Sequence, residues 1–461
     1  MWTEVEPTPA PRRVLWALVL AGTAVSLAVS VRIAAGTLVL GSASGRWVYQ
    51  YLYGFRPHAL AVFGVVAGCC IVAAMVPLGE VRRRQWLVIV MWLVVGGLSQ
   101  AVLRQLTPYS LEQIFVSDGS DGFYTAASQH GPADLLRNFD RLRPTFGSVH
   151  ARSNMPGKLL LVHAMERVSS NPAVLAWLVV LLSNLGGVLL YLFVRDLLAD
   201  RETALASLIL YLFVPAKLVF FPVLNTLTPV LLLGCAWLWM RLIRSHAIAY
   251  AVASGVAIFG VALYEPTPLV AGVLFGVLTA QALWRGDIGW RSAASRTGIV
   301  ALAFLATYTV FLAAFRFDLF ATLRAIARDA IDFNASGNRP YAIWVPENLF
   351  DFLFGMGVCQ ALIFCWSAAS AMRRGRLAAR GAAGAVSAFA LGTAATLVVA
   401  DLLGINRGEV VRLWIFLACL AQVPAAYVCA RLGSRAALMV VLSATLLQVA
   451  LSTSMLAFAQ P

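Results

Sequence analysis

The chain has 461 residues, of which 61% are hydrophobic and only 12% are charged. A soluble domain is nearer half apolar and a quarter charged, so this composition excludes an ordinary soluble or a disordered protein. Lys and Arg number 35 against 21 Asp and Glu, which gives a net charge of +14. Because the arginines lie in short loops between apolar segments, they predict membrane orientation and no nucleic-acid partner.

Apolar segments of membrane-spanning length recur along the chain and predict about thirteen transmembrane helices. We therefore expect an all-α polytopic membrane protein with a single membrane-embedded domain over residues 1–461. The predicted spans are residues 14–38, 58–77, 86–106, 172–194, 203–222, 226–243, 247–264, 266–284, 297–315, 348–371, 381–401, 413–430 and 436–457.

Arginine placement also predicts the topology. Alternate loops are short and basic, among them Arg12-Arg13, Arg82 to Arg84 and Arg373 to Arg380, so that face is predicted to be cytoplasmic. The tail 1–13 then lies inside, and an odd number of spans places the C-terminus outside. The Ala-, Val- and Arg-rich composition is typical of a high-GC bacterium, and we expect the protein in a bacterial plasma membrane.

Two longer loops, residues 107–171 and 316–347, are predicted on the extracytoplasmic face and carry short interfacial helices. In the first loop, Asp118 and Asp121 are three residues apart. If a helix begins at Asp121, both carboxylates can face one cleft. They could then accept the proton of a hydroxyl or hold a divalent cation. The alternative is a helix cap and a solvated turn.

Further along the same loop, the run HARSNMPGK combines basic and amide side chains, and its Pro-Gly pair predicts a turn before a short apolar helix. Basic side chains at the membrane surface suit a phosphate group, although an ordinary interfacial anchor has the same composition. The candidate residues of this run are His150, Arg152, Asn154 and Lys158.

A third group of candidates lies at the start of a late span, in the run NRGEVVRLW. Charges at the edge of a span need a partner or a ligand, because their desolvation is costly. Glu409 and Arg412 are three residues apart and could pair, or Arg412 could bind an anion. The candidates are Arg407, Glu409, Arg412 and Trp414.

Single polar residues mark other turns on the outer face. Glu265 lies between two spans beside two prolines, and Asn225 and Lys217 flank a similar turn. Glu265 and Asn225 are candidates for substrate binding. Turn chemistry and a snorkelling Lys217 are the stronger interpretations.

The second outer loop contains an apolar stripe with arginines beside it, which predicts an amphipathic helix on the membrane surface. The stripe consists of Leu323, Ile326, Ala327 and Ala330. Such a helix could cover a lipid-facing cleft, or it could simply connect two spans.

Several catalytic signatures are absent from the sequence: the phosphate-binding P-loop, the G-x-S-x-G elbow, the H-E-x-x-H zinc helix and the C-x-x-C pair. The predicted spans also contain few acidic residues at mid-depth, whereas ion-coupled transporters usually need some. These features favour chemistry at the outer surface.

In three elements the sequence resembles the bacterial integral-membrane glycosyltransferases of the GT-C superfamily. These are the acidic pair in a large outer loop, the later His…Asn-x-Pro-Gly run (His150, Asn154, Pro156 and Gly157), and the Gly-Glu-Val-x-Arg-Leu-Trp element from Gly408 to Trp414. The chain departs from the usual pattern in having two further spans before the acidic loop and Asn-Met-Pro-Gly in place of Pro-Pro-Gly.

The resemblance implies an inverting transfer of a sugar from a polyprenyl-phosphate donor to a hydroxyl, on the extracytoplasmic side. Mannose is the first expectation and arabinofuranose the second, and the carried-over base is Asp121 or Asp118. A phosphate leaving group needs no acid but does need cations, for which Arg152, Lys158, Arg407 and Arg412 are candidates. Small loops favour a small or lipid-linked acceptor. A lipid-linked-sugar flippase, or a structural subunit without a ligand, are the alternatives.

Overall fold

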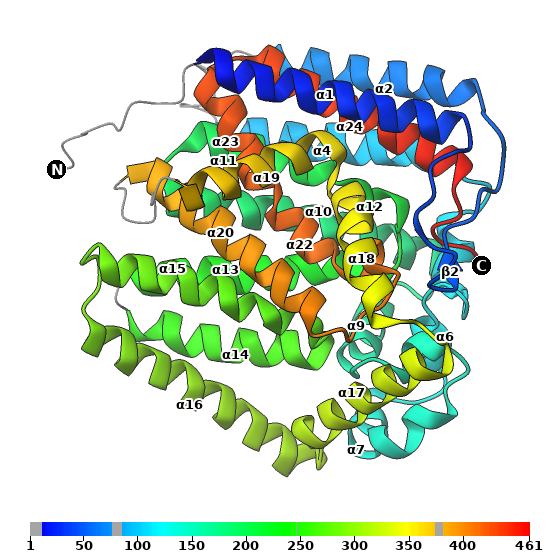
Figure 1. Cartoon of the computed structure of the whole chain (residues 1–461). Coiled ribbons are helices and arrows are strands. Elements are labelled where there is room, and N and C mark those ends of the chain that lie inside the picture. Colours follow the sequence, from blue (N-terminus) through cyan, green and yellow to red (C-terminus); the bar gives the residue numbers. More distant parts are fainter. Residues whose placement is uncertain (1–11, 76–84, 246, 374–380) are drawn as a thin grey trace.

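The computed structural model describes residues 12–75, 85–245, 247–373 and 381–461. Long helices run side by side through this part of the chain (Figure 1). The strands among the described residues form one short antiparallel hairpin, β1 (Gly41–Ser42) with β2 (Trp47–Val48). The chain is an all-α polytopic membrane protein, as the sequence predicts. Most of the tail 1–13, Arg82 to Arg84 and Arg374 to Arg380 lie outside the described residues.

Ten described helical segments are long and apolar enough to cross a membrane. These segments differ in how many of their residues are buried. In the apolar stretch of α11 and α12, 94% of the residues are buried, so this segment is central. In α16 the share is 6%, so this helix is peripheral. The ten are α1 (Arg12–Ala34), α4 (Gln85–Arg104), α10 (Pro172–Leu198), α11 (Arg201–Leu212) with α12 (Pro215–Val219), η2 (Leu224–Leu227) with α13 (Thr228–Ser245), η3 (Thr267–Ala271) with α15 (Gly272–Trp284), α16 (Trp290–Phe315), α20 (Gly381–Leu402), α22 (Ile415–Leu420) with α23 (Gln422–Leu432), and α24 (Arg435–Met455).

Three further apolar elements complete the match to the predicted spans. Helices α18 (Tyr341–Met356) and α19 (Val358–Arg373) meet at a bend of 115° and form an eleventh candidate if the pair is one span. Helices α2 (His58–Ala74) and α14 (Ile248–Tyr264) are apolar but have only 17 residues each. Every predicted range overlaps one of these elements, and the count of thirteen spans stays a prediction.

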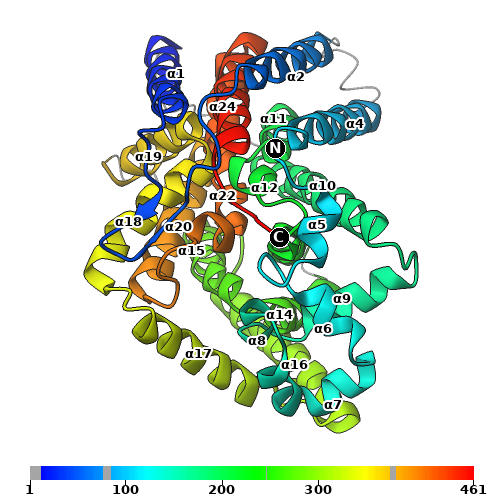
Figure 2. The same cartoon turned by 90° about the vertical axis from the view of Figure 1, so that its right-hand side faces the viewer.

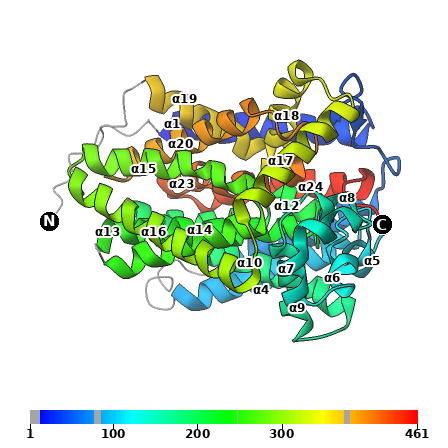
Figure 3. The same ribbon diagram turned by 90° about the horizontal axis from the view of Figure 1, so that it is seen from below.

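The two long loops gather at one end of the bundle, opposite the start of α1 (Figures 1 and 3). The first loop packs around an apolar cluster that it shares with the bundle helices α10 and α14, and its own contribution includes Phe115, Phe123, Phe139 and Phe146. The second loop forms α17 (Leu319–Ser336). The helices of the first loop are α5 (Leu111–Val116), α6 (Phe123–Ser128), α7 (Pro132–Leu142), η1 (Arg143–Thr145), α8 (Val149–Arg152) and α9 (Gly157–Glu166).

Local sequence signals explain where several helices begin. Ser110 and Gln113 form a reciprocal capping box at the start of α5. The side chain of Asn171 caps α10, with Pro172 in the first turn. Asp318 accepts two backbone N–H groups at the start of α17. The outer helices therefore begin at residues that satisfy their free N–H groups.

Close packing of α14 on α16 generates a stability prediction. A Cβ atom added at Gly255 would lie 2.4 Å from the Val300 carbonyl oxygen, whereas one at Gly260 of the same helix meets no atom within 4 Å. We expect Gly255→Ala to push the helices apart and to lower the melting temperature of the purified protein, because small residues set such approaches. Gly260→Ala is the matched control, and equal melting temperatures for both variants would contradict the packing.

Candidate functional site

The turn 117–122 positions the two aspartates differently. The Ser117 hydroxyl accepts the N–H groups of Gly119 and Ser120, and helix α6 begins only at Phe123, after Gly122. Gly122 has φ +67°, and a Cβ atom there would overlap the side chain of Ser148. Asp121 therefore does not open the helix, which differs from the sequence expectation. Asp118 is exposed on the surface, and Asp121 points into the protein.

Asp121 is a buried carboxylate at the junction of the loop and the bundle. It is 2% exposed, and its Oδ2 atom accepts the backbone N–H of Leu224 at 2.9 Å. Burial raises the pKa of Asp121 to about 6, against the opposing effects of the nearby Lys158 ammonium and the Leu224 hydrogen bond. A carboxyl group with a pKa near neutrality is suited to exchange protons.

Lys158, Glu265 and Asn225 meet beside Asp121, although they come from separate parts of the sequence. The fully buried Nζ atom of Lys158 lies 3.1 Å from Oε2 of Glu265. Asn225 donates to both oxygens of Glu265, and Thr228 donates to Oε2 at 2.6 Å. The carboxylate is thus fully engaged, and its interactions join the first loop to the starts of α13 and η3.

The Pro156-Gly157 turn allows Lys158 to reach this position. A Cβ atom at Gly157 would lie 2.5 Å from the Leu263 carbonyl oxygen and 2.6 Å from the Cα atom of Tyr264. Helix α9 can therefore begin against the end of α14 only with glycine at this position. The predicted turn followed by a short helix is confirmed.

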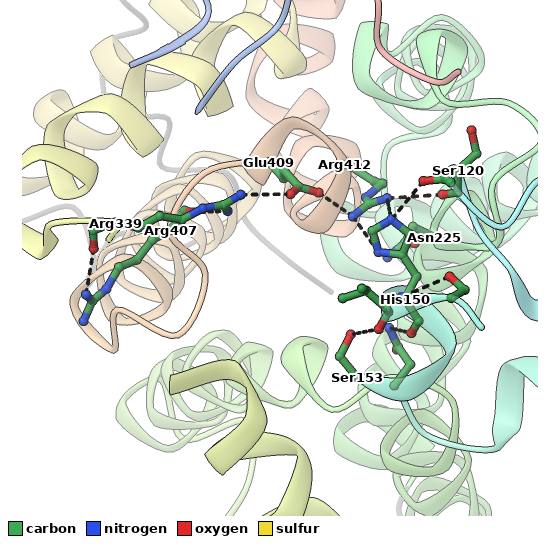
Figure 4. A network of polar contacts seen from close by, with 12 residues as sticks. Ser120, His150, Ser153, Asn225, Arg339, Arg407, Glu409 and Arg412 are labelled. Carbon is green, nitrogen blue, oxygen red and sulfur yellow. Dashed lines mark hydrogen bonds and ion pairs between the residues drawn. The ribbon is translucent and has the colours of Figure 1, made fainter. Parts of the chain in front are cut away.

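Arg412 is the centre of a second polar group, which Figure 4 shows. Its Nη2 atom donates to Oε2 of Glu409 at 2.5 Å, and its Nη1 atom donates to the Ser120 carbonyl at 3.3 Å. The His150 ring lies against the guanidinium, with Nε2 at 3.2 Å from Nη1 and Nδ1 at 3.3 Å from Nη2. His150 Nε2 also lies 3.2 Å from the Gly119 carbonyl oxygen.

This environment keeps the imidazole neutral. The Arg412 charge, followed by burial, lowers the pKa of His150 to about 3. Burial alone would raise the pKa of Glu409, but the charges of Arg412 and Arg339 outweigh it, and the pKa is lowered. Arg412 and Glu409 therefore form an ion pair, as the spacing allowed, and His150 is an uncharged member of the group.

Arg407 and Arg339 form a reciprocal clamp between the second loop and the turn before α21 (Val410–Leu413). Arg407 donates to the Arg339 carbonyl at 2.9 Å and to the Gly404 carbonyl at 3.0 Å. Arg339 donates to the Arg407 carbonyl at 2.7 Å and pairs with Glu409 at 3.4 Å. The structure thus places the Arg407 guanidinium on backbone carbonyls.

The remaining candidates lie around these two groups. Arg152 is exposed, and Asn154 donates to the His150 carbonyl at 3.4 Å. Trp414 is fully buried and its Nε1 atom donates to Asn406 at 3.3 Å, so it anchors the turn from within. Lys217 is also fully buried and donates to Asn184 at 3.0 Å, so the snorkelling interpretation is wrong.

Two residues of the polar groups, Ser120 and Arg339, were not predicted from the sequence. Ser120 supplies a carbonyl to Arg412, and its hydroxyl donates to the Gln460 carbonyl in the segment after α24. In the sequence, Arg339 stands between Asn338 and Pro340, a pattern that indicates only a turn. Backbone carbonyls carry no sequence signal, so Ser120 had none. A charged residue in the second outer loop was the available signal for Arg339.

A divalent cation held by Asp118 and Asp121 does not fit the described geometry. One carboxylate is exposed, and the other is buried and accepts a backbone N–H. Among the described residues, no three His, Cys, Asp or Glu side chains form a group that could hold a metal ion. We therefore assign no step to a metal.

Two comparisons with known proteins give no match. No protein-family model matches the chain, and a search of curated proteins finds no match. The functional argument therefore depends on the residues of the site.

The buried Lys158–Glu265 pair generates a prediction. Lys158→Met leaves a buried carboxylate without its cation, which typically costs about 3–5 kcal/mol of stability. We expect a clearly lower melting temperature in detergent, with partial recovery in the double variant Lys158→Met, Glu265→Gln, which removes both charges. A single variant as stable as the wild type would show that the pair is not formed.

Proposed function

We propose that the protein is a membrane glycosyltransferase that moves a sugar from a polyprenyl-phosphate donor to a hydroxyl of a small or lipid-linked acceptor. One observation carries the proposal. A buried carboxylate with a pKa near neutrality lies beside a buried lysine and an arginine network at the loop-bearing end of a membrane bundle. A base and phosphate-binding cations are the groups that this reaction needs.

Asp121 is the proposed base. Leu224 occupies its Oδ2 atom, which leaves Oδ1 to accept a proton from the acceptor hydroxyl. The new bond forms between the acceptor oxygen and the anomeric carbon, on the face opposite the departing phosphate, so the configuration inverts. Asp118 is exposed and lacks the burial that raises the pKa of Asp121, and it is therefore our second choice.

Arg412 and Lys158 are the proposed cations for the departing phosphate. Positive groups fixed before the reaction stabilise charge that develops in the transition state. Both lie close enough to Asp121 to lower its pKa. Arg152 is exposed nearby and could extend this group, with Asn154 beside it. Arg407 serves the site indirectly, because it holds the turn that carries Glu409.

Helix α17 is the proposed cover for the donor's lipid chain. It crosses the loop-bearing end between α16 and α18 (Figure 2). Near its start, Thr322 donates to Asp140 at 3.0 Å, and further along the helix Asp329 pairs with Arg143. At its far end, Asn334 donates to the Ile405 carbonyl at 2.9 Å. Tethers at both ends favour a fixed roof over a mobile gate.

The orientation of the protein in the membrane is part of the same proposal. Thirteen spans, with the basic loops in the cytoplasm, put the site on the extracytoplasmic face of a bacterial plasma membrane. Polyprenyl-phosphate sugars presented on that face would reach the site from within the membrane.

Substitution of the two aspartates tests the reaction. The protein in nanodiscs receives a short-chain polyprenyl-phosphate mannose, then the arabinofuranose donor, with a mixed acceptor pool, and released polyprenyl phosphate is measured. We expect Asp121→Asn to lose about 100-fold or more of the activity, the usual contribution of a general base. Asp118→Asn is the matched control and should stay near wild type.

Two results would count against this proposal. If Asp118→Asn alone abolishes release, the base is the other aspartate. If the wild type binds donors but cleaves none, and both variants bind equally, the flippase alternative is favoured.

The acid limb of the pH profile tests the role of Asp121 separately. The base must be ionised, and its pKa is raised from 3.8 to about 6. Activity should therefore fall with a one-proton dependence as the pH drops through about 6, whereas an ordinary aspartate would stay ionised to about pH 4. Activity that stays constant down to pH 4.5 would contradict the assignment.

A further inference from the structure

The contact between His150 and Arg412 fixes the protonation state of the imidazole. A guanidinium carries only hydrogen-bond donors, and a backbone carbonyl only accepts. Nε2 of His150 lies 3.2 Å from both the Gly119 carbonyl oxygen and Nη1 of Arg412, and with its hydrogen on Nε2 the ring donates to the carbonyl. Nδ1, 3.3 Å from Nη2 of Arg412, then accepts from the guanidinium. This tautomer forms both bonds, and a ring nitrogen that accepts from a guanidinium requires a neutral imidazole.

A second proton on His150 is incompatible with this contact. It would remove the acceptor at Nδ1 and would place two cations in van der Waals contact. Glu409 favours the cationic ring but already pairs with Arg412 and Arg339. The charged groups that act on the ring are Arg412 and Glu409 at the start of α21 and Lys158 on α9.

Arg412 retains an unused donor. Its side chain is 11% exposed, and its Nε atom is buried without a hydrogen-bond partner among the described residues. An oxyanion at this guanidinium would satisfy further N–H groups and would offset the positive charge that excludes a proton from His150.

We propose that binding of an oxyanion at Arg412 is coupled to the uptake of one proton by His150. The proton comes from solvent and binds at Nδ1, the contact between Nδ1 and Nη2 of Arg412 is given up, and the ring and the guanidinium both donate to the anion. No covalent bond of the ligand changes. The identity of the anion as a donor phosphate rests on the proposed function, whereas the coupling requires only an oxyanion.

The linkage between proton uptake and anion binding gives the expected change in anion affinity with pH. The pKa of His150 is about 3 in the free protein. If the anion restores the ordinary value of about 6.5, the affinity should rise about 30-fold as the pH falls from about 7.5 to about 5. A site without a proton-accepting group would bind a constant-charge anion with little dependence on pH.

The experiment uses inorganic sulfate, whose charge is constant over this range, and the full-length protein in nanodiscs. Isothermal titration calorimetry in two buffers of different ionisation enthalpy measures the affinity and the protons taken up. Asp121→Asn is the background for all measurements, because Asp121 also titrates near pH 6. In this background we expect proton uptake at pH 5.5 and the full change in affinity with pH.

His150→Gln in the same background should bind sulfate with a nearly constant affinity and without proton uptake, and His150→Asn serves as a second neutral variant. His130→Gln is the matched control from the same loop, because His130 lies beside Asp134 and not at Arg412. The same pH dependence in both His150 variants would overturn the proposal, as would sulfate binding that is absent or insensitive to Arg412→Gln. Donor cleavage is measured separately, so its failure would not count against the coupling.

Discussion

The arrangement of the outer loops depends on the placement of one guanidinium. Arg412 contacts the Ser120 carbonyl, the His150 ring and the Glu409 carboxylate, which belong to two distant parts of the chain. A buried guanidinium needs acceptors on every side, because each unsatisfied donor costs free energy. The turn 117–122 and the start of α21 are therefore held in register by the same side chain.

Sequence reasoning recovers the spans well because membrane crossing is a local property. A run of apolar residues of sufficient length is enough to define it, and each predicted range overlaps a helical element of the structure. The same reasoning finds most polar positions of the site. Charges at the edge of a span are costly, so their presence already indicates a partner or a ligand.

The pairings within the site could not be predicted in this way. Lys158 and Glu265 lie in separate loops, and no local pattern says that they meet. The difference between Asp118 and Asp121 follows from the positive φ of Gly122 and the position of Ser148, both of which belong to the folded loop. Arg407 and Arg412 look alike in sequence, yet one binds backbone carbonyls and the other contacts the carboxylate and the imidazole.

The tethers of α17 have a mechanical consequence. The helix is joined to the first loop through Asp329 and Arg143, and to the turn before α21 through Asn334 and Ile405. It is a second rigid connection between two parts of the molecule that Arg412 also joins. A displacement at Arg143 is therefore transmitted from Asp329 to Asn334, along about 8 Å of rigid helix at 1.5 Å per residue, to the turn that carries Glu409. A displacement of the first loop therefore also displaces the turn that carries Glu409, although the residues between them keep their own contacts.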